Sequence, residues 1–231
     1  METNYQKFLA GEYCNHLDQE VLQMIVQTKN LLARLNATNI TDSATRDALL
    51  RHMLGSIGKY SSIDINFHCE CGKHIFISKK VIINMNCTFL DDNIIKIGNN
   101  VLIAPNVQLY TATHPINANE RFVNDWDERS GDLFFRTKAL PITIEDNVWI
   151  GGGTIVLPGI TIGRNSVIGA GSVVTKSIPT YSVAVGNPCR VIRELPKEDA
   201  PCHEHPRQNT SVKSNPDRSA AGSLGTTSPF S

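Results

Sequence analysis

Residues 141–179 read PITIEDNVWIGGGTIVLPGITIGRNSVIGAGSVVTKSIP and repeat with a period of six. Every sixth residue is aliphatic or small, and a second, mostly aliphatic residue stands two positions further on. The first series comprises Ile142, Val148, Thr154, Ile160, Ser166, Ser172 and Ile178, and the second comprises Ile144, Ile150, Val156, Ile162, Ile168 and Val174. A repeat of this kind decides the architecture before any local propensity does.

A six-residue period is typical of short strands joined by turns. In a strand of about three residues, the first and third side chains point to the same face. A turn then redirects the chain, and glycine or asparagine adopts the positive φ of such turns at little cost. Three segments close one triangular coil, and stacked coils share a continuous apolar interior. The sequence therefore predicts a mainly β protein built as a parallel β-helix.

The same step occurs earlier in the chain, and helical patterns precede it. The earlier block runs through Cys69, Ile75, Val81 and Cys87, then resumes after a short insertion at Ile95, Val101, Val107 and Thr113. Apolar spacing predicts helices over 17–35 and 43–54, the second with Asp42 or Ser43 as its N-cap and Gly55 as its end. We expect these helices to cover one end of the β-helix, since an open coil exposes its core and strand edges.

Two segments interrupt the pattern. Residues 115–140 carry mixed charges and aromatic rings, which predicts a long loop protruding from one coil, and such loops are usually functional or disordered. Residues 197–231 are rich in Pro, Ser, Asn, Thr and Gly, which predicts a disordered tail. The expected organisation is a helical cap over 1–56, a β-helix domain over 57–196 and this tail.

Composition excludes several classes of protein. The 231 residues carry 22 basic and 22 acidic side chains, so no net field draws the chain to nucleic acid or an anionic membrane. No apolar run approaches the roughly 18 residues that span a bilayer, and the polar N-terminus lacks the apolar stretch of a signal peptide. We expect a cytoplasmic protein without nucleic-acid or membrane partners, whose cysteines are reduced thiols.

Several motifs resemble those of the maltose, galactoside and nodulation-type O-acetyltransferases. They are KFLAGEYCNHLDQEV at 7–21, INMNCTFLDD at 83–92, IGNNVLIAPNVQLYTATHP at 97–115, the repeat at 141–179 and GNPCRVIR at 186–193. The resemblance covers the chain from about Lys7 to Arg193, apart from the central loop. It implies a left-handed β-helix, acetyl-CoA as co-substrate and transfer of an acetyl group to a sugar hydroxyl. It also implies a homotrimer with active sites between subunits.

The acceptor side needs a base for the incoming hydroxyl and donors for the oxyanion. His114, in TATHP where the repeat gives way to the loop, is the expected catalytic base because imidazole titrates near neutral pH. The resemblance implies that Asn84 and Asp92 bind the acceptor, with Asn15 and Glu70 near two further acceptor positions. The alternatives are a histidine packed at a coil corner and ordinary turn residues.

The cofactor side needs bare backbone for the pantetheine arm of coenzyme A and cations for its phosphates. The resemblance implies that Gly152, Ala170, Thr175, Lys176 and Arg193 line this site. Trp149 either flanks the arm or covers a surface between subunits.

The chain departs from the family in the phrase LFFRTKALPI at 133–142. Many relatives have a carboxylate shortly before this strand that orients the catalytic histidine, and the candidates here are Asp125, Asp127, Glu128 and Asp132 of the loop. Asn15 also replaces an aspartate that is common in relatives. These differences leave open an acetyltransferase of the same fold that acts on an antibiotic, serine or an amino sugar, or a non-catalytic scaffold.

Two clusters carry metal-ligating residue types: Cys69, Cys71 and His74, and Cys202, His203 and His205. Neither has the four ligands in paired spacing that are typical of zinc, so no metal is predicted. A carbonic anhydrase of this fold would need three converging histidines, and only His114 is well placed.

Overall fold

Helices precede the coils in the computed structural model, which describes residues 3–15 and 18–197. The two predicted helices are α2 (Gln19–Ala37) and α3 (Ser43–Met53), and the Asp42 carboxylate accepts a hydrogen bond from the Thr45 N–H at 3.1 Å as the N-cap of α3. A further helix, α1 (Asn4–Leu9), was not predicted, because it is short and polar. Its capping box joins Thr3 and Gln6.

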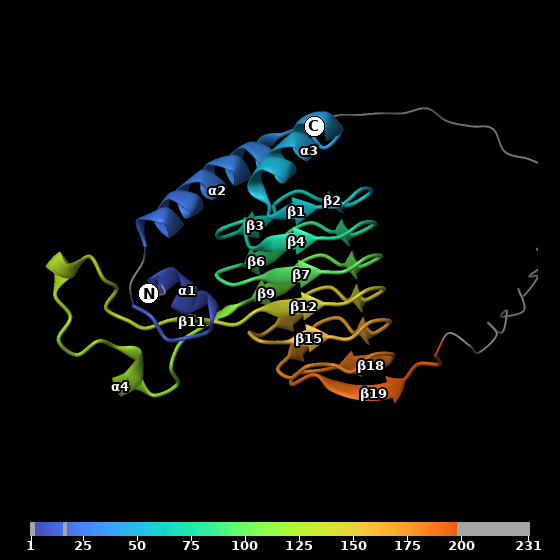
Figure 1. Cartoon of the computed structure of the whole chain (residues 1–231). Helices are drawn as coiled ribbons and strands as arrows, with labels where there is room; N and C mark the ends of the chain where they lie inside the picture. Colours follow the sequence, from blue (N-terminus) through green and yellow to red (C-terminus); the bar gives the residue numbers. More distant parts are fainter. Residues whose placement is uncertain (1–2, 16–17, 198–231) are drawn as a thin grey trace, which may run out of the picture. The chain divides into compact units, whose positions relative to one another are not determined.

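Three sheets form the coils, and each complete coil adds one short strand to each of these sheets (Figure 1). The first sheet comprises β1 (Ser56–Ile57), β4 (Ile75–Ile77), β7 (Ile95–Ile97), β12 (Ile142–Ile144) and β15 (Thr161–Ile162). The second comprises β2 (Ser62–Ile63), β5 (Ile82–Ile83), β8 (Leu102–Ile103), β13 (Trp149–Ile150), β16 (Val167–Ile168) and β18 (Ser182–Val185), with β19 (Arg190–Glu194) antiparallel at its end. The third comprises β3 (His68–Cys69), β6 (Thr88–Leu90), β9 (Gln108–Tyr110), β14 (Ile155–Val156) and β17 (Val173–Val174). The predicted parallel β-helix is confirmed.

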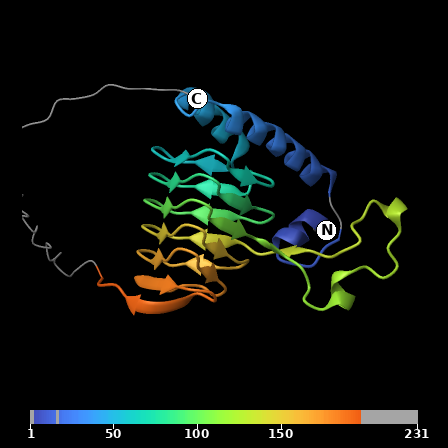
Figure 2. The same ribbon diagram turned by 180° about the vertical axis from the view of Figure 1, so that it is seen from behind.

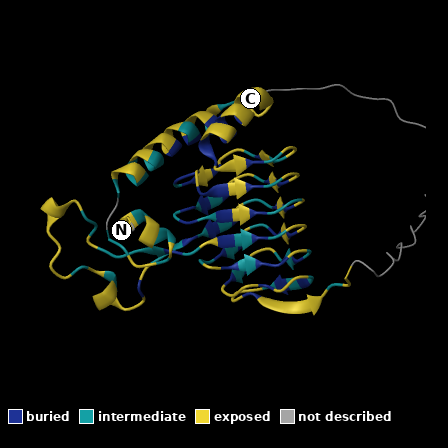
Figure 3. Ribbon diagram, in the orientation of Figure 1, coloured by how far each residue is buried: buried dark blue, intermediate teal, exposed yellow. Residues whose placement is uncertain are grey.

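The core lies inside the coils, as the burial colours show (Figure 3). Every residue of the series that starts at Ile142 is buried, and so is every residue of the series that starts at Ile144. Each fully buried aliphatic side chain stabilises the fold by roughly 1.5–3 kcal/mol. In the earlier block Thr113 is the exception, because it leaves the coil and pairs with Lys138.

Turns of one shape form the corner between the second and third sheets. Five equivalent residues have a left-handed φ between 56° and 69°: Asn66, Asn86, Asn106, Gly153 and Gly171. Asparagine and glycine are the residues that tolerate this conformation best. The coils therefore stay in register, and residues at equivalent positions stack in columns along the molecule.

The loop at 115–140 leaves the coils through a short antiparallel ribbon of β10 (Ala112–Thr113) and β11 (Lys138–Ala139). It contains α4 (Ala118–Arg121) and the 3-10 turn η1 (Glu128–Ser130), so it is more regular than predicted. A bridge between Cys14 and Thr137 ties its return limb to the segment that follows α1, and the loop and α1 lie on the same side of the coils in both ribbon views (Figures 1 and 2).

The helices α2 and α3 cover the first coil, as predicted. Arg46 of α3 is buried and donates hydrogen bonds to backbone carbonyls on both sides of this contact, including those of Leu35 at 2.9 Å and Ile63 at 2.9 Å. No helix within the described ranges is long and apolar enough to cross a membrane. The predicted tail lies outside these ranges, except for Lys197.

Candidate active site

His114 stands at the corner between the third and first sheets, where the loop begins. Its Nδ1 lies 2.9 Å from the Arg136 carbonyl oxygen and 3.3 Å from the Thr137 hydroxyl. A carbonyl only accepts, so Nδ1 carries the proton and donates it, which leaves the lone pair on Nε2. The ring also packs edge-on against Phe135, with centroids 5.4 Å apart. A loop backbone group thus orients the exposed imidazole.

A chamber of about 310 Å³ adjoins this corner, and we call it the cap chamber. Its walls come from α1, α2 and the returning loop, including Tyr5, Phe8, Val21, Ile25, Leu133 and Phe135. The carboxyl groups of Asp92 and Glu70 also line it. Phe135 and Thr137 contact His114 and line the chamber too, so the imidazole stands beside it.

Asp92 has the electrostatic features of a ligand-binding carboxyl group. Burial and the neighbouring Glu70 together raise its pKa to about 6, against the lowering effects of its own backbone N–H, Lys29 and His114. Its Oδ2 is buried and has no hydrogen-bond partner among the described residues. The group is therefore mostly ionised at pH 7 and still able to accept a hydrogen bond.

Asp91, which the sequence reasoning missed, supports the chamber from behind. Its fully buried Oδ1 accepts the backbone N–H groups of Glu70 at 2.8 Å and Cys71 at 3.0 Å. Burial raises the pKa of Asp91 to about 7. The adjacent acids in LDD were the only signal in the sequence, and they do not reveal which one faces inward.

The other two predicted acceptor residues have protein partners. The Glu70 carboxylate pairs with the α2 residue Lys29 at 2.7 Å. Asn15 donates from its side chain to the Leu133 carbonyl oxygen at 3.4 Å and is not among the residues lining the chamber. Its neighbour Cys14 takes that place, so in this structure Asn15 joins the N-terminal segment to the loop.

Asn84, Gly152 and Ala170 lie at a different corner of the same chain, between the second and third sheets. Asn84 follows β5, and its Oδ1 accepts the Met85 N–H at 2.8 Å. Gly152 and Ala170 occupy equivalent positions in successive coils, and the Gly171 N–H donates to the Gly152 carbonyl oxygen at 2.9 Å. Neither residue places a bulky side chain over this corner.

The remaining predicted cofactor residues are spread over the surface. Thr175 and Lys176 are exposed at the corner that also carries His114, two coils further along. Arg193 is exposed on β19 and pairs with Val183 in the second sheet. Trp149 projects outward from the second sheet. A single chain therefore does not gather these residues into one pocket.

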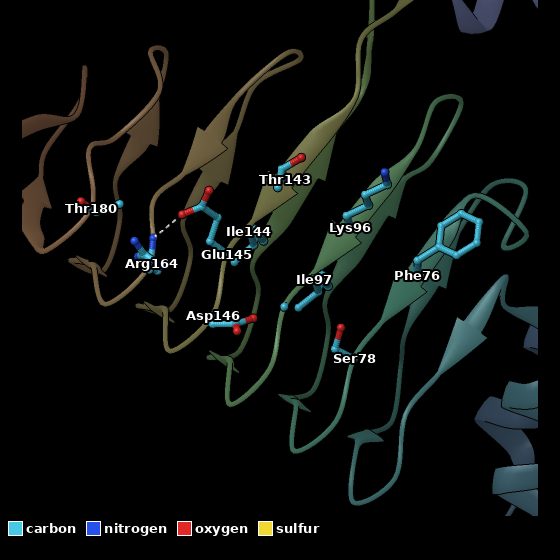
Figure 4. Close-up of a pocket in the computed structure, with 11 residues that line it drawn as sticks. Phe76, Ser78, Lys96, Ile97, Thr143, Ile144, Glu145, Asp146, Arg164 and Thr180 are labelled. Carbon is cyan, nitrogen blue, oxygen red and sulfur yellow. Dashed lines mark hydrogen bonds between the residues drawn. The ribbon is translucent and has the colours of Figure 1, made fainter.

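A groove of about 650 Å³ lies elsewhere, on the outer face of the first sheet, and none of the predicted site residues lines it (Figure 4). Phe76, Lys96 and Thr143 form its floor, and the Arg164 backbone N–H donates to Glu145 at 2.8 Å on its rim. Within the described ranges, no group of three or more His, Cys, Asp and Glu side chains could hold a metal ion. Cys69 fills the core, whereas Cys202, His203 and His205 lie outside the described residues.

The geometry at the His114 corner suits proton transfer. It combines an oriented imidazole with a free lone pair, a neighbouring ionised carboxyl group and an adjoining cavity of ligand size. A hydroxyl group held by Asp92 could give its proton to Nε2.

Comparison with known proteins places these features in a family. Residues 7–58 match the maltose acetyltransferase hexapeptide capping motif, and residues 141–176 match the bacterial transferase hexapeptide (six repeats). The galactoside O-acetyltransferase of Escherichia coli is 36% identical over 194 residues, which are 84% of this chain and 90% of that protein.

Two solved structures share the fold over most of their length. A maltose O-acetyltransferase from Clostridium difficile is 43% identical with a TM-score of 0.77, covering 85% of this chain and 99% of that one. A galactoside acetyltransferase in complex with coenzyme A is 35% identical with a TM-score of 0.77, covering 86% of this chain and 94% of that one. The chain therefore belongs to the maltose and galactoside family of hexapeptide-repeat O-acetyltransferases.

Proposed function

We propose that this protein transfers the acetyl group of acetyl-CoA to a sugar hydroxyl, with His114 as the general base. The observation that carries the proposal is the hydrogen bond from Nδ1 to the Arg136 carbonyl, which leaves the Nε2 lone pair as a proton acceptor next to the chamber that Asp92 lines. The family relationship supports the reaction type, because the similar galactoside acetyltransferase binds coenzyme A.

The reaction is a direct attack. Asp92 accepts a hydrogen bond from one acceptor hydroxyl, and Nε2 of His114 removes the proton of another. The resulting oxygen attacks the thioester carbonyl, and a backbone N–H stabilises the oxyanion. The C–S bond then breaks, and the imidazolium returns its proton to the departing thiolate. The Arg136 carbonyl stabilises the imidazolium, in the place of the acids expected in the loop.

The complete site forms between two copies of the chain in a homotrimer. His114 and Asp92 lie at one corner of the coils, whereas Asn84, Gly152 and Ala170 lie at another. An outward stripe on the second sheet supports association, because Ile82, Leu102 and Trp149 are in register and 42%, 50% and 54% exposed. Contiguous apolar side chains of this kind mark interaction surfaces. A cyclic trimer has heterologous contacts, in which the stripe of one chain packs against a different face of the next chain, so the second corner of one can meet the His114 corner of the next.

A charge in this stripe should separate the subunits. We expect the wild type to show about three times the chain mass of 25.4 kDa in light scattering, and Leu102→Lys to show the mass of one chain. The control Lys96→Glu changes a charge on the outer face of the first sheet and should leave the mass unchanged. A wild type of 25.4 kDa would contradict the trimer.

The cations Lys176 and Arg193 should bind the phosphates of acetyl-CoA. Replacing either with alanine removes a charge-assisted hydrogen bond, so we expect KM for acetyl-CoA to rise about 10-fold or more with little change in kcat. Lys59→Ala, which removes an exposed cation from the first coil at the other end of the β-helix, is the control. Unchanged KM values in both variants would place the phosphates elsewhere.

The test of the function is CoA release from acetyl-CoA in the presence of maltose, glucose, galactosides, amino sugars, serine or chloramphenicol. Release that depends on a sugar supports the proposal. Release that depends only on serine or chloramphenicol would favour the same chemistry on a non-sugar acceptor. If none of these acceptors gives release, the scaffold alternative or an acceptor outside this panel is favoured. A burst of CoA before acceptor is added would contradict direct attack.

A further inference from the structure

A second cavity is lined by His114 and shares Phe135 with the cap chamber, but its chemical character is different. It measures about 240 Å³ and is lined by His114, Arg121, Phe122, Phe134 and Phe135. Among the described residues that line it, none is an acid, whereas Asp92 and Glu70 line the cap chamber. The cavity therefore offers a cation and aromatic faces beside the proposed base.

The guanidinium of Arg121 is the unusual group in this cavity. Its Cζ lies 5.4 Å from the centroid of the Phe122 ring, a cation–π contact. Its Nε is buried and has no hydrogen-bond partner among the described residues, and no carboxylate of residues 3–15 and 18–197 pairs with it. Buried donors are normally satisfied, so an Nε–H without a partner, on an arginine that lines a cavity, points to a ligand that accepts hydrogen bonds.

The other arginines of the loop show that this lack of a partner is specific to Arg121. Arg129 forms a two-point pair with Asp127, with an N–O distance of 3.0 Å. Arg136 donates to the carbonyl oxygens of Glu120 at 2.8 Å and Phe122 at 3.3 Å. The loop thus satisfies two of its arginines internally and leaves the one that faces His114 unpaired.

The backbone of Arg136 hydrogen-bonds to both Arg121 and His114 and so links their positions. The Arg136 N–H donates to the Arg121 carbonyl at 2.8 Å, and the Arg136 carbonyl accepts from His114. The rings between them form a continuous series, with centroid distances of 4.9 Å for Phe134–Phe135 and 6.3 Å for Phe122–Phe134. Such aromatic faces suit the apolar face of a sugar ring.

We propose that Arg121 is a specificity-determining residue and that the preferred acceptor is an acidic sugar, one that carries a carboxylate or a phosphate. The guanidinium binds the anionic group through its fork, which matches both chemistries. The anionic group of the acceptor enters this cavity beside Phe122 and Phe134, and the sugar hydroxyls remain at His114 and Asp92. This inference rests on the proposed function and deepens it.

The experiment compares acceptors at one ionic strength. CoA release from acetyl-CoA is measured with glucose, glucuronic acid and glucose 1-phosphate, for the wild type, Arg121→Gln and Arg121→Lys. Arg129→Gln is the matched control, because it removes a charge from the same loop without facing the cavity. We expect the wild-type KM for at least one acidic sugar to be about 10-fold or more below that for glucose. Arg121→Gln should abolish this difference and keep the turnover of glucose, and Arg121→Lys should retain part of it.

The outcomes separate this inference from the proposed function. If the wild type has the same KM for glucose as for both acidic sugars, the role of Arg121 is overturned and sugar acetylation still stands. The same holds if the preference for an acidic sugar persists in Arg121→Gln. Loss of glucose turnover in both Arg121 variants would also overturn it, because Arg121 would then serve the fold or the chemical step. No turnover of any sugar by the wild type would overturn both proposals. A preference for only one acidic sugar would identify the anionic group.

Discussion

His114→Ala should lower kcat for acetyl transfer at least about 100-fold, because general-base catalysis contributes roughly 10²–10⁴-fold. Removal of the imidazole eliminates the proton acceptor and also the group that the Arg136 carbonyl and Phe135 hold in place. The imidazole acts on the acceptor hydroxyl and not on the phosphates of the cofactor, so KM for acetyl-CoA should change little. The measurement is sugar-dependent CoA release at saturating acetyl-CoA.

The control for this prediction is His52→Ala, which removes an exposed histidine from the last turn of α3. It should keep wild-type activity. Equal activity of His114→Ala and the wild type would reject His114 as the base while leaving the fold and family unaffected. Loss of activity in both variants would indicate a general loss of folded protein, which circular dichroism detects independently.

Arg46→Met should have the largest effect on stability, lowering the free energy of unfolding by about 3 kcal/mol. The buried guanidinium donates to the carbonyl oxygens of Leu35 and Thr38 on one side, and to those of Ile63 and Asp64 on the other. Methionine fills similar space but donates nothing, so these carbonyl groups lose their partner between the cap and the first coil. The expected decrease in Tm is roughly 6–12 °C, measured at one protein concentration.

Arg34→Met is the matched control, since Arg34 is exposed on the last turn of α2. Its Tm should stay close to that of the wild type. An unchanged Tm for Arg46→Met would show that apolar packing of α2 and α3, through residues such as Leu35 and Leu50, is sufficient to hold the cap on the coils.

Sequence reasoning located the repeat down to individual buried positions, because the period of six is set by backbone geometry that every coil shares. It located α2 and α3 to within two residues at each end, because apolar spacing and the Asp42 cap are local signals. It missed α1, whose contacts are long-range: the Asn93 side chain donates to the Leu9 carbonyl at 2.9 Å, and the Tyr5 hydroxyl pairs with His74. It also placed Thr113 in the core. The chain leaves the coil at this residue because Thr113 pairs with Lys138 in the antiparallel ribbon, and Lys138 is distant in the sequence.

The sequence by itself determined the β-helix, its helical cap and the family, because each depends on patterns that repeat or on motifs that are contiguous along the chain. It also singled out His114 and Asp92 as candidate site residues. Only the tertiary structure decided what surrounds them: that a backbone carbonyl at Arg136 orients His114, that Glu70 is paired with Lys29, and that Arg121 faces the same cavity as His114 without a partner. The physical reason is that coil stacking fixes columns of equivalent residues, whereas the loop and α1 obtain their positions from single hydrogen bonds and ring contacts between distant residues. Spacing along the chain carries no signal for such contacts.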